Sequence, residues 1–444
     1  MKGTSSPGSI STRLQRVANL AKQSPDMIFT TLAHHIDLVL LKEAFRLTRK
    51  DGATGVDQQT AAEFEEQLDD NLTSLLDRFK SGVYKAPSVK RAYIPKAKGA
   101  ARPIGIPTFE DKVLQRAVAM VLGAVYEQDF LDCSYGFRPG RSCHQALDAL
   151  WRGIMSMGGG YVYEVDISKF FDTLDHGHLR SFLDLRVRDG VIRRTIDKWL
   201  KAGVFEAGQV VYPDAGTPQG GVISPLLANI YLHEVLDKWF EHTVKPRLQG
   251  KAFLIRYADD FVMVFNNEMD ARKVEAVVPK RLGRFSLAIH PEKTRLVRFR
   301  PPGGGPGSGG HPQHSFDLLG FTHYWGKSLK ENWVVKRVTA KDRLARALKA
   351  IGEWCRINRH TDVADQHRTL VLKVKGHYQY YGITGNSRRL NAFREGVQKS
   401  WLKWLGRRSQ RSDMSWQYLT LLKKKYPLPF AVVVHSIYRG VARP

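Results

Sequence analysis

The sequence predicts an α+β fold built around an antiparallel sheet and followed by a basic helical region. Short apolar, β-prone segments at 161–171, 252–265 and 316–325 alternate with segments whose apolar residues recur at helical spacing. The first two of these segments carry aspartates at a strand end or a tight turn. From about residue 327 onward the pattern is helical and rich in Lys and Arg. Strands and helices that are grouped in this way are typical of an α+β protein.

The N-terminal part is predicted to be mainly helical. Residues 1–25 are polar and contain Gly and Ser, so we expect a flexible segment there. Residues 26–80 are expected to form helices, interrupted by the turn-rich DGATGVD at 51–57. From Ala62 to Phe79 the apolar residues recur at helical spacing.

The next elements alternate between strands and helices. Residues 84–107 have short β-prone pieces around a Lys/Gly-rich turn, which predicts a hairpin. Residues 110–130 have helical periodicity, and YVYEVDISKFF at 161–171 predicts a buried strand with a helix from about Leu174. Residues 216–240 begin with the Gly/Pro loop GTPQGGVISP and continue as a helix.

The segment AFLIRYADDFVMVF at 252–265 predicts a β-hairpin, in which two apolar strands flank a tight acidic turn. A helix at 269–284 and a strand at 293–300 are expected to follow. The Gly/Pro segment 301–312 is interpreted as a loop between two strands, and FDLLGFTHYW at 316–325 as the next strand.

The charge of the chain points to a polyanionic partner. With 69 Lys and Arg against 43 Asp and Glu, the formal net charge is +26. Residues 327–444 hold 26 Lys and Arg against 7 Asp and Glu, so this last quarter carries +19 of the excess. A solvated basic surface is the alternative, but uncompensated like charge of this density opposes folding unless a partner is bound. Nucleic acid is therefore favoured over a membrane.

Cysteine usage and hydropathy indicate an intracellular protein. Cys133, Cys143 and Cys355 form no C-x-x-C pair, so neither a disulfide framework nor a structural zinc site is expected. The N-terminus has no apolar core of a secretory signal, and no apolar run has membrane-spanning length. We expect a soluble cytoplasmic protein without a membrane partner, associated with the nucleoid when it is bound to DNA.

Three aspartates form the candidate catalytic site. Asp259 and Asp260 lie at a hairpin turn between apolar strands, and Asp166 ends another apolar strand. An exposed turn is the plain alternative for an isolated Asp pair, but two charges beside apolar strands are costly unless a cation compensates them. Mg²⁺ prefers oxygen ligands, and two such ions about 4 Å apart can catalyse nucleotidyl transfer. The pattern predicts a two-metal polymerase site.

A series of motifs resembles the reverse transcriptases, in the expected order. YVYEVDISKFFDTLDH, GTPQGGVISPLLANIYL and RYADDFVMVF resemble their motifs A, B and C. YGFRPGRSCHQAL and YIPKAKGAARPIGIPT resemble motifs of the group II intron and retron branch that precede motif A. FSLAIHPEKTRLVRF and LLGFTHYW resemble motifs D and E. The resemblance implies a right-hand polymerase fold, with fingers and palm around the antiparallel sheet and an all-helical thumb or X domain.

The resemblance assigns roles to residues at the matching positions. Asp166 and Asp259 match the two principal metal ligands, Asp260 the third acid, and Ile167 a ligand through its backbone carbonyl. The implied cofactors are two Mg²⁺ ions, with Mn²⁺ as a substitute. Near the first motif, Asp175 is interpreted as a helix-start acid; Asp172 is expected to be structural, and His176 and His178 polar and on the surface.

Five further residues match nucleotide-binding positions. Phe171 matches the steric gate that excludes a ribose 2′-hydroxyl, although a core aromatic is the alternative. Lys293 matches a candidate general acid for pyrophosphate, with a surface lysine as the alternative. The other three match positions that contact the incoming triphosphate or its sugar: Lys96, Arg102 and Gln219.

The basic C-terminal region resembles the thumb and maturase (X) domain of group II intron-encoded proteins. Its arginine clusters are expected to contact RNA: Arg388, Arg389, Arg407, Arg408 and Arg411. The interleaved aromatics, such as Tyr378 and Trp401, are favoured as core residues over base-stacking ones. The implied partners are group II intron RNA, an RNA template with a DNA primer, dNTPs and target DNA.

The predicted organisation has five parts: a flexible N-terminus (1–25), a helical extension (26–83), fingers and palm (84–326), thumb and X domain (327–412) and a short tail (413–444). Because no H-N-H endonuclease segment with cysteine pairs follows in the sequence, we expect the endonuclease-lacking form, with a primer made elsewhere. Two alternatives stay open. One is a domesticated relative in DNA repair or phage defence, and the other is an RNA-binding splicing factor without catalytic activity.

Overall fold

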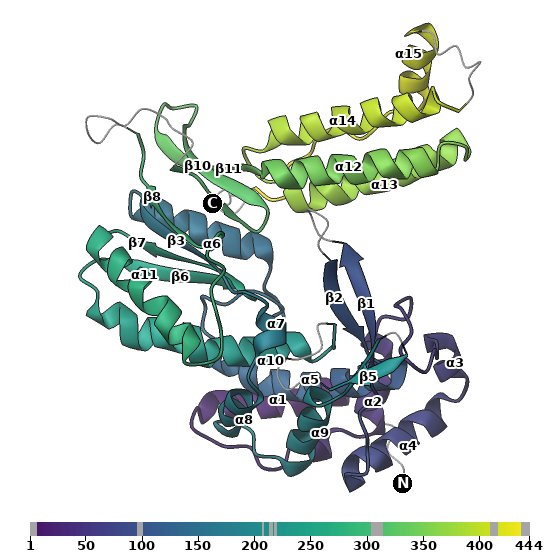
Figure 1. Ribbon diagram of the computed structural model, residues 1–444, viewed down its shortest axis with the longest axis vertical. Helices are drawn as coiled ribbons and strands as arrows, with labels where there is room; N and C mark the ends of the chain where they lie inside the picture. Colours follow the sequence, from purple (N-terminus) through teal and green to yellow (C-terminus); the bar gives the residue numbers. More distant parts are fainter. Residues whose placement is uncertain are drawn as a thin grey trace. The chain divides into compact units, whose positions relative to one another are not determined.

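The structure is a computed structural model that describes residues 7–95, 101–206, 208–212, 216, 220–302, 314–408 and 416–436 (Figure 1). The chain divides into two compact units. The first comprises Met1–Ser142, Tyr163–Met263 and Met269–Arg295, and the second Cys143–Val162, Val264–Glu268 and Leu296–Pro444. The five-part organisation predicted from the sequence stays a prediction.

The first unit is mostly helical. Its helices are α1 (Pro7–Gln23), η1 (Ala33–His35), α2 (Leu38–Leu47), α3 (Ala61–Glu66), α4 (Leu68–Ser81), α5 (Phe109–Asp129), α7 (Phe170–Thr173), α8 (His176–Asp184), α9 (Gly190–Leu200), α10 (Ser224–Leu232), η3 (His233–Asp237), η4 (Trp239–Val244), η5 (Lys245–Arg247) and α11 (Glu268–Gly283), the last beginning one residue before the division. The predicted helices at 26–80, 110–130 and 269–284 are confirmed, with the predicted break at 51–57.

The N-terminal segment is a helix, so the expectation of a flexible N-terminus is wrong for residues 7–23. Helix α1 packs on α5, and Ile10, Val17, Ala18 and Ala21 are buried on one side of it. These residues lie at positions i, i+7, i+8 and i+11, which places them on one helical face. The overall polarity of the segment concealed this narrow apolar stripe.

One sheet in the first unit has the strand order β2-β1-β4-β5. Its strands are β1 (Val89–Pro95), β2 (Ala101–Ile106), β4 (Val204–Glu206) and β5 (Gln209–Val211). Strands β1 and β2 form the predicted antiparallel hairpin, with Ile94 opposite Arg102, whereas β4 runs parallel to β1. Most of the Lys/Gly-rich turn of this hairpin lies outside the described residues.

The aspartates belong to a second four-stranded sheet, of order β6-β7-β3-β8. Its strands are β3 (Gly160–Asp166), β6 (Ala252–Tyr257), β7 (Asp260–Phe265) and β8 (Arg295–Phe299). The predicted acidic hairpin is confirmed, because β6 and β7 are neighbours joined by only two residues. Figure 1 shows α11 lying over this sheet, and the buried Val274 and Val278 of α11 supply its apolar face.

The second unit combines a small sheet with long helices. Strands β9 (Phe316–Leu318), β10 (Phe321–Lys327) and β11 (Trp333–Thr339) form an antiparallel sheet of order β11-β10-β9. The helices are α6 (Cys143–Ser156), α12 (Lys341–Ile357), α13 (Val363–Tyr381), α14 (Ser387–Leu405) and α15 (Trp416–Lys425). Figure 1 shows α12, α13 and α14 side by side.

Two expectations for this unit are wrong. The segment 316–325 is a hairpin of two strands, because Leu319 and Gly320 both adopt positive φ and form a tight turn. The region after residue 327 is not all-helical, because Trp333–Thr339 pairs with β10 along seven residues. Val335, Arg337 and Thr339 are buried in alternation, a strand period that the basic composition concealed. The predicted loop segment 303–312 lies outside the described residues.

The core of the long helices confirms the preferred interpretation of their aromatics. Tyr378 and Trp401 are buried in a cluster with Leu370, Val374 and Leu390. The indole nitrogen of Trp401 donates to Gln366 Oε1 over 2.9 Å. These rings therefore pack the protein interior and are not available to stack on bases.

In the described part of the chain, no helix is long and apolar enough to cross a membrane.

Candidate active site

The end of strand β3 places Asp166 beside the segment that connects α11 to β8. The carbonyl of Asp166 accepts a hydrogen bond from the backbone nitrogen of His290 over 2.7 Å, and Ser168 N–H donates to Ala288 O over 2.8 Å. Ile167 is buried and pairs with Ile289 in an isolated antiparallel bridge. The backbone on both sides of Asp166 is therefore fixed by the segment that resembles motif D.

The acidic turn holds Asp259 between β6 and β7. Ala258 adopts a left-handed conformation, with φ of 58°. For a residue with a Cβ this conformation costs about 1–2 kcal/mol, so the surrounding contacts must maintain it. Gly136 packs on the turn so closely that an added Cβ would lie 2.4 Å from Ala258 N. Asp260 begins β7 and is exposed.

A fully buried ion pair lies directly behind this turn. The guanidinium of Arg256 donates to both carboxylate oxygens of Asp237, over 2.7 and 2.5 Å. It also donates to the Ala258 carbonyl over 3.1 Å, to Asn229 Oδ1 over 2.9 Å and to Ser134 Oγ over 2.7 Å. Both members of the pair have no exposed side-chain surface. Burial disfavours the charged form of Arg256, but Asp237 offsets this effect through its negative charge and its hydrogen bonds. The pKa of Arg256 is therefore raised overall.

This network joins three separate parts of the sequence to the acidic turn. Asn229, on α10, also donates to the carbonyl of Gly136 over 2.7 Å. Ser134 forms an isolated parallel bridge with Arg256. Asp237 reaches Arg256 from the end of η3, a π-helical turn, and such turns are frequent at functional sites. The acidic turn is thus supported by buried polar contacts on its inner side.

Asp259 lies within electrostatic range of Asp166. Burial raises the pKa of Asp259, the backbone hydrogen bond lowers it, and the negative charge of Asp166 raises it again. The positive charges of Arg102 and Arg256 act in the opposite direction. The net effect is a raised pKa, which means that the ionised pair lacks full compensation. A cation placed near both carboxylates would supply that compensation.

Lys293 contacts the carboxylate of Asp166. Its Nζ lies 2.6 Å from Asp166 Oδ2, while 61% of the lysine side chain is exposed. The neighbouring Arg295 pairs with Glu164 over 2.7 Å. Lys293 therefore lies at the candidate site, and its exposed side chain leaves room for it to move.

His176 contacts Gly216, which lies in the connection between β5 and α10. Its Nε2 lies 2.5 Å from the Gly216 carbonyl, and Gly216 N–H donates to Leu174 O over 2.8 Å. The expectation that His176 lies on the surface is wrong, because this contact holds the ring in the interior. Asp175 caps α8 by accepting from His178 N over 2.7 Å, as predicted. Gly220, in the same connection, packs against the carbonyl of Gly105 on β2.

The remaining residues with expected nucleotide contacts lie around these elements. Phe171 is half-buried on α7, edge-to-face with the buried Phe170 at 5.4 Å between ring centroids. Arg102 is exposed on β2. Lys96 and Gln219 lie outside the described residues.

The carboxylates of Asp166 and Asp259 offer oxygen ligands suited to a hard cation. Across the described ranges, no three His, Cys, Asp or Glu side chains lie close enough together to hold a metal ion by themselves. Mg²⁺ in nucleotidyl-transfer sites is commonly bound by one or two carboxylates together with substrate phosphates. The pair Asp166 and Asp259 fits that arrangement.

Comparison with known proteins identifies the family. Residues 94–323, about half of the chain, match the model of the family described as reverse transcriptase (RNA-dependent DNA polymerase). The chain belongs to this reverse transcriptase family. The matched residues include the acidic turn, the end of β3 and the segment that carries Lys293.

Curated relatives place this reverse transcriptase near the group II intron-encoded proteins. It is 39% identical over 232 residues to the group II intron-encoded protein LtrA of Lactococcus lactis subsp. cremoris, a match that covers 51% of this chain and 38% of the relative. It is 34% identical over 291 residues to protein YkfC of Escherichia coli, covering 58% and 76%. Nuclear intron maturase 2, mitochondrial, of Arabidopsis thaliana is 28% identical over 282 residues, covering 51% and 36%. The chain thus spans well under half the length of LtrA.

The expected RNA-binding arginines of this reverse transcriptase lie on and after α14. Arg388 and Arg389 are exposed in its first turn, and the exposed Arg407 lies over the Trp404 ring at 5.3 Å. Arg408 instead donates to the backbone carbonyls of Arg359 and Thr361, so it joins α14 to the loop between α12 and α13. Arg411 lies outside the described residues.

The sequence motifs do not identify the residues that support the site. Arg256 directly precedes the Tyr-Ala-Asp-Asp sequence, and a lone Arg within an apolar strand is a signal of a buried ion pair. Its partner Asp237 is 19 residues away in a helical segment, and nothing in the spacing connects the two. The same holds for His176 and Gly216, which are 40 residues apart.

Proposed function

We propose that this reverse transcriptase copies a group II intron RNA into DNA from a DNA primer and binds the same RNA to assist its splicing. The observation that carries the polymerase activity is the pair Asp166 and Asp259, held by rigid backbone at the end of β3 and at the β6–β7 turn. The family match supports this assignment of the site.

Mg²⁺ would be held by Asp166 and Asp259, with the backbone carbonyl of Ile167 and the carboxylate of Asp260 as further ligands. Mn²⁺ would be the substitute. When two ions are bound, they supply activation of the primer 3′-hydroxyl and neutralisation of the phosphate charge. Burial, together with the negative charge of Asp166, raises the pKa of Asp259, and a buried carboxylate beside a second one favours a divalent cation.

The other site residues bind and orient the nucleotide. The cation of Arg102, with that of Lys96, would contact the triphosphate of the incoming dNTP. Phe171 would lie under the sugar and exclude a 2′-hydroxyl, and Gln219 would pack beside the same sugar. Lys293 would leave Asp166 and donate a proton to the pyrophosphate oxygen as the bond to the α-phosphate breaks. Its exposed, flexible side chain is compatible with that movement.

The intron RNA would bind through the basic C-terminal region. Arg388, Arg389 and Arg407 have exposed guanidinium groups on one end or the other of α14 and would neutralise RNA phosphates. Support for this partner comes from the group II intron-encoded and maturase relatives. Target DNA would enter as the source of the primer.

Primer extension tests the polymerase activity. We expect the purified chain with Mg²⁺ to extend a DNA primer on an RNA template, and to incorporate dNTPs in preference to rNTPs. Replacement of Phe171 by Ala, but not by Tyr, should relax this preference. Failure to extend on RNA under conditions where a DNA template is copied would contradict the assignment.

Equilibrium binding tests the RNA partner. Changing Arg388, Arg389 and Arg407 to Gln should weaken binding of the flanking intron RNA and lower the slope of log affinity against log salt by about 0.7 per lost phosphate contact. An unchanged slope would exclude this surface as the RNA contact. The matched control changes Lys399 and Lys403, which lie on the same helix, together with Lys349 on α12.

A further inference from the structure

A pocket of about 690 Å³ lies in the first unit, away from the aspartates in sequence and outside every motif assigned above. It is formed by three segments of the chain: the connection from α4 to β1, the second half of α9 with the residues that connect it to β4, and the residue after β5. The residues that bear on its chemistry are Tyr84, Lys85, Arg194, Lys198, Lys201 and Tyr212. A pocket of this size is within the range of sites that hold a small ligand or a piece of a polymer.

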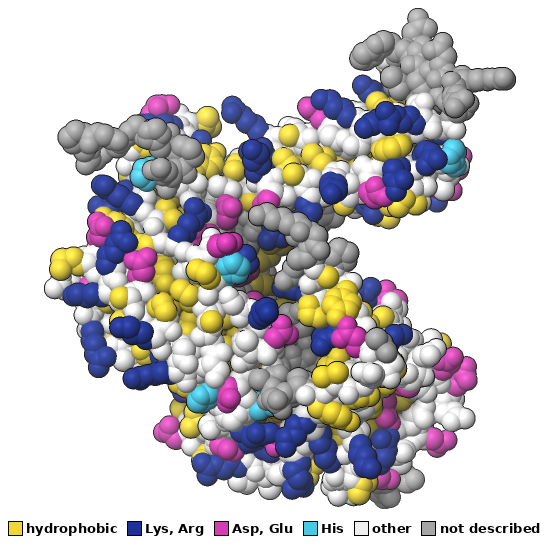
Figure 2. All heavy atoms as spheres, in the orientation of Figure 1, with side chains coloured by type: hydrophobic (Ala, Val, Ile, Leu, Met, Phe, Trp, Pro, Cys, Tyr) yellow, Lys and Arg dark blue, Asp and Glu magenta, His cyan; other side chains and the backbone are white. Residues whose placement is uncertain are grey.

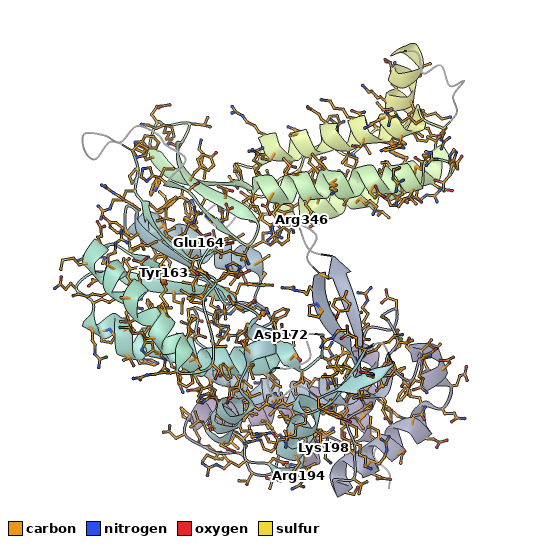
Figure 3. All side chains as sticks on the ribbon, in the orientation of Figure 1. Tyr163, Glu164, Asp172, Arg194, Lys198 and Arg346 are labelled. Carbon is orange, nitrogen blue, oxygen red and sulfur yellow. The ribbon has the colours of Figure 1, made fainter. Side chains whose placement is uncertain are left out.

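The floor of the pocket is rigid. Lys198 donates to the carbonyls of Gly82 and Tyr84 over 2.7 and 2.6 Å, so its charge fixes the α4–β1 connection to α9. Asp197, the acidic residue of the lining, is paired with Arg180 over 2.6 Å. In Figure 3, Arg194 and Lys198 are labelled close together at α9. The shape of the pocket is therefore maintained without a ligand.

Tyr212 provides an exposed aromatic surface at the pocket. Its ring lies over Gly203, where an added Cβ would be 3.0 Å from Tyr212 Cε1 and 2.3 Å from the Val210 side chain. One part of the ring is thus held against backbone, while 71% of the residue is exposed. The ring is open to solvent beside the pocket lining, and an accessible aromatic face is suited to stacking on a base.

Three cations surround the same pocket. Lys85, Arg194 and Lys201 are exposed, and none of them forms an ion pair with any residue that the structure describes. Figure 2 shows Lys and Arg side chains gathered over the part of the molecule that carries α8 and α9. With Asp197 already neutralised, the field in the pocket is positive, which favours an anionic ligand.

We propose that this pocket binds one segment of single-stranded nucleic acid, with a base stacked on Tyr212 and its phosphates beside Lys85, Arg194 and Lys201. Fixed aromatic rings next to unpaired cations are the recurring elements of single-strand binding. A second copy of this chain is disfavoured as the occupant, because each copy carries a formal charge of +26. This contact rests on the proposed function only for the class of ligand, nucleic acid. It is separate from the contact through the C-terminal arginines.

The test uses the full chain and a fluorescein-labelled ten-nucleotide oligo(U), followed by polarisation. Tyr212→Ala should weaken binding about tenfold through loss of stacking, whereas Tyr212→Phe should bind like the unchanged protein. Changing Lys85, Arg194 and Lys201 together to Gln should lower the salt slope by about 2, at roughly 0.7 per phosphate contact. A parallel titration with a ten-nucleotide oligo(dU) distinguishes an RNA strand from a DNA strand, because the two oligonucleotides carry the same base and differ only in the 2′-hydroxyl.

The matched control removes three exposed Lys charges of the same unit that do not line the pocket, Lys22, Lys273 and Lys280. This control should change the salt slope by less than 0.5. Equal binding by Tyr212→Ala and Tyr212→Phe, or an equal loss in the control, would overturn the proposal. A fold check by circular dichroism accompanies each variant. Because the assay contains no primer and no dNTP, its result is independent of polymerase activity.

Discussion

Replacement of Arg256 by Lys should slow primer extension through the geometry of the acidic turn. Lysine can still pair with Asp237, but one ammonium cannot also donate to Ala258 O, Asn229 and Ser134. The carbonyl of Ala258 then loses its donor, and the left-handed conformation of that residue loses one of the contacts that maintain it. The position of Asp259, the next residue, should therefore become less defined.

The magnitude follows from the contacts that are lost. Removing one partner of a buried ion pair costs about 3–5 kcal/mol, and Lys retains part of the pairing. Three buried acceptors without a donor cost about 1 kcal/mol or more each, so we expect a total loss of stability of about 3 kcal/mol. Relaxation of the turn recovers about 1–2 kcal/mol of backbone strain. The position of Asp259 that supports catalysis is then disfavoured by the same strain of about 1–2 kcal/mol. An increase of this size in the activation free energy corresponds to roughly a tenfold lower rate.

Arg186→Lys is the matched control. Arg186 is also buried, pairs with Asp129 over 2.8 Å and donates to the carbonyls of Ala21, Ser24 and Met27. Its contacts join α1 to the body of the unit and none of them involves the acidic turn. Both variants should lose stability in urea unfolding, whereas only Arg256→Lys should lower kcat at a temperature where both are folded.

The kinetic pattern distinguishes a positioning role from a general loss of folding. Arg256→Lys should lower kcat with little change in the KM for dNTP, because Arg256 is fully buried and its side chain has no surface that could contact a nucleotide. Equal kcat values for the two variants at equal folded fraction would refute the reasoning. A fall in kcat for Arg186→Lys of the same size would refute it as well.

Three other predictions follow from single contacts. Gly136→Ala should lower both stability and kcat, because a Cβ would lie 2.4 Å from Ala258 N; urea unfolding and extension assays measure the two effects, and full activity would contradict the packing. Lys293→Gln should lower the rate of single-nucleotide addition by about a hundredfold or more if the ammonium is the proton donor, and a rapid-quench time course that matches the unchanged protein would exclude that role. Burial raises the pKa of Asp111 from 3.8 to about 6, so the neutral acid is the form that the fold favours. Its contribution is present at pH 4 and lost as the pH rises through 6, by up to about 3 kcal/mol, and Asp111→Asn should remove this part of the pH dependence of unfolding.

The strands and helices that have a strong period could be predicted from the sequence. The hairpins at 89–106 and 252–265 and the helix α5 all follow from apolar spacing and turn residues. The errors fall where the period is weak or mixed with charge. Helix α1 has only a narrow apolar stripe. In β11 the buried face carries Arg337 beside Val335, and composition alone would assign an arginine to a basic surface.

At the candidate site, residues within local motifs could be predicted, whereas contacts between distant segments of the sequence could not. Asp166, Asp259 and Lys293 could be proposed as site residues because each belongs to a local sequence motif, and the structure places Lys293 at Asp166. The supporting contacts of Arg256 with Asp237 and of His176 with Gly216 could not be found. They depend on which segments meet in three dimensions, and a single sequence does not contain that information in its spacing.

Primer extension by Asp259→Ala tests the central claim most directly. The assay uses an RNA template, a DNA primer, dNTPs and Mg²⁺, with RNA binding measured on the same protein. We predict that extension is abolished while RNA affinity stays within about twofold, because removal of one carboxylate leaves the basic surfaces unchanged. Normal extension by Asp259→Ala would contradict the assignment of the catalytic site.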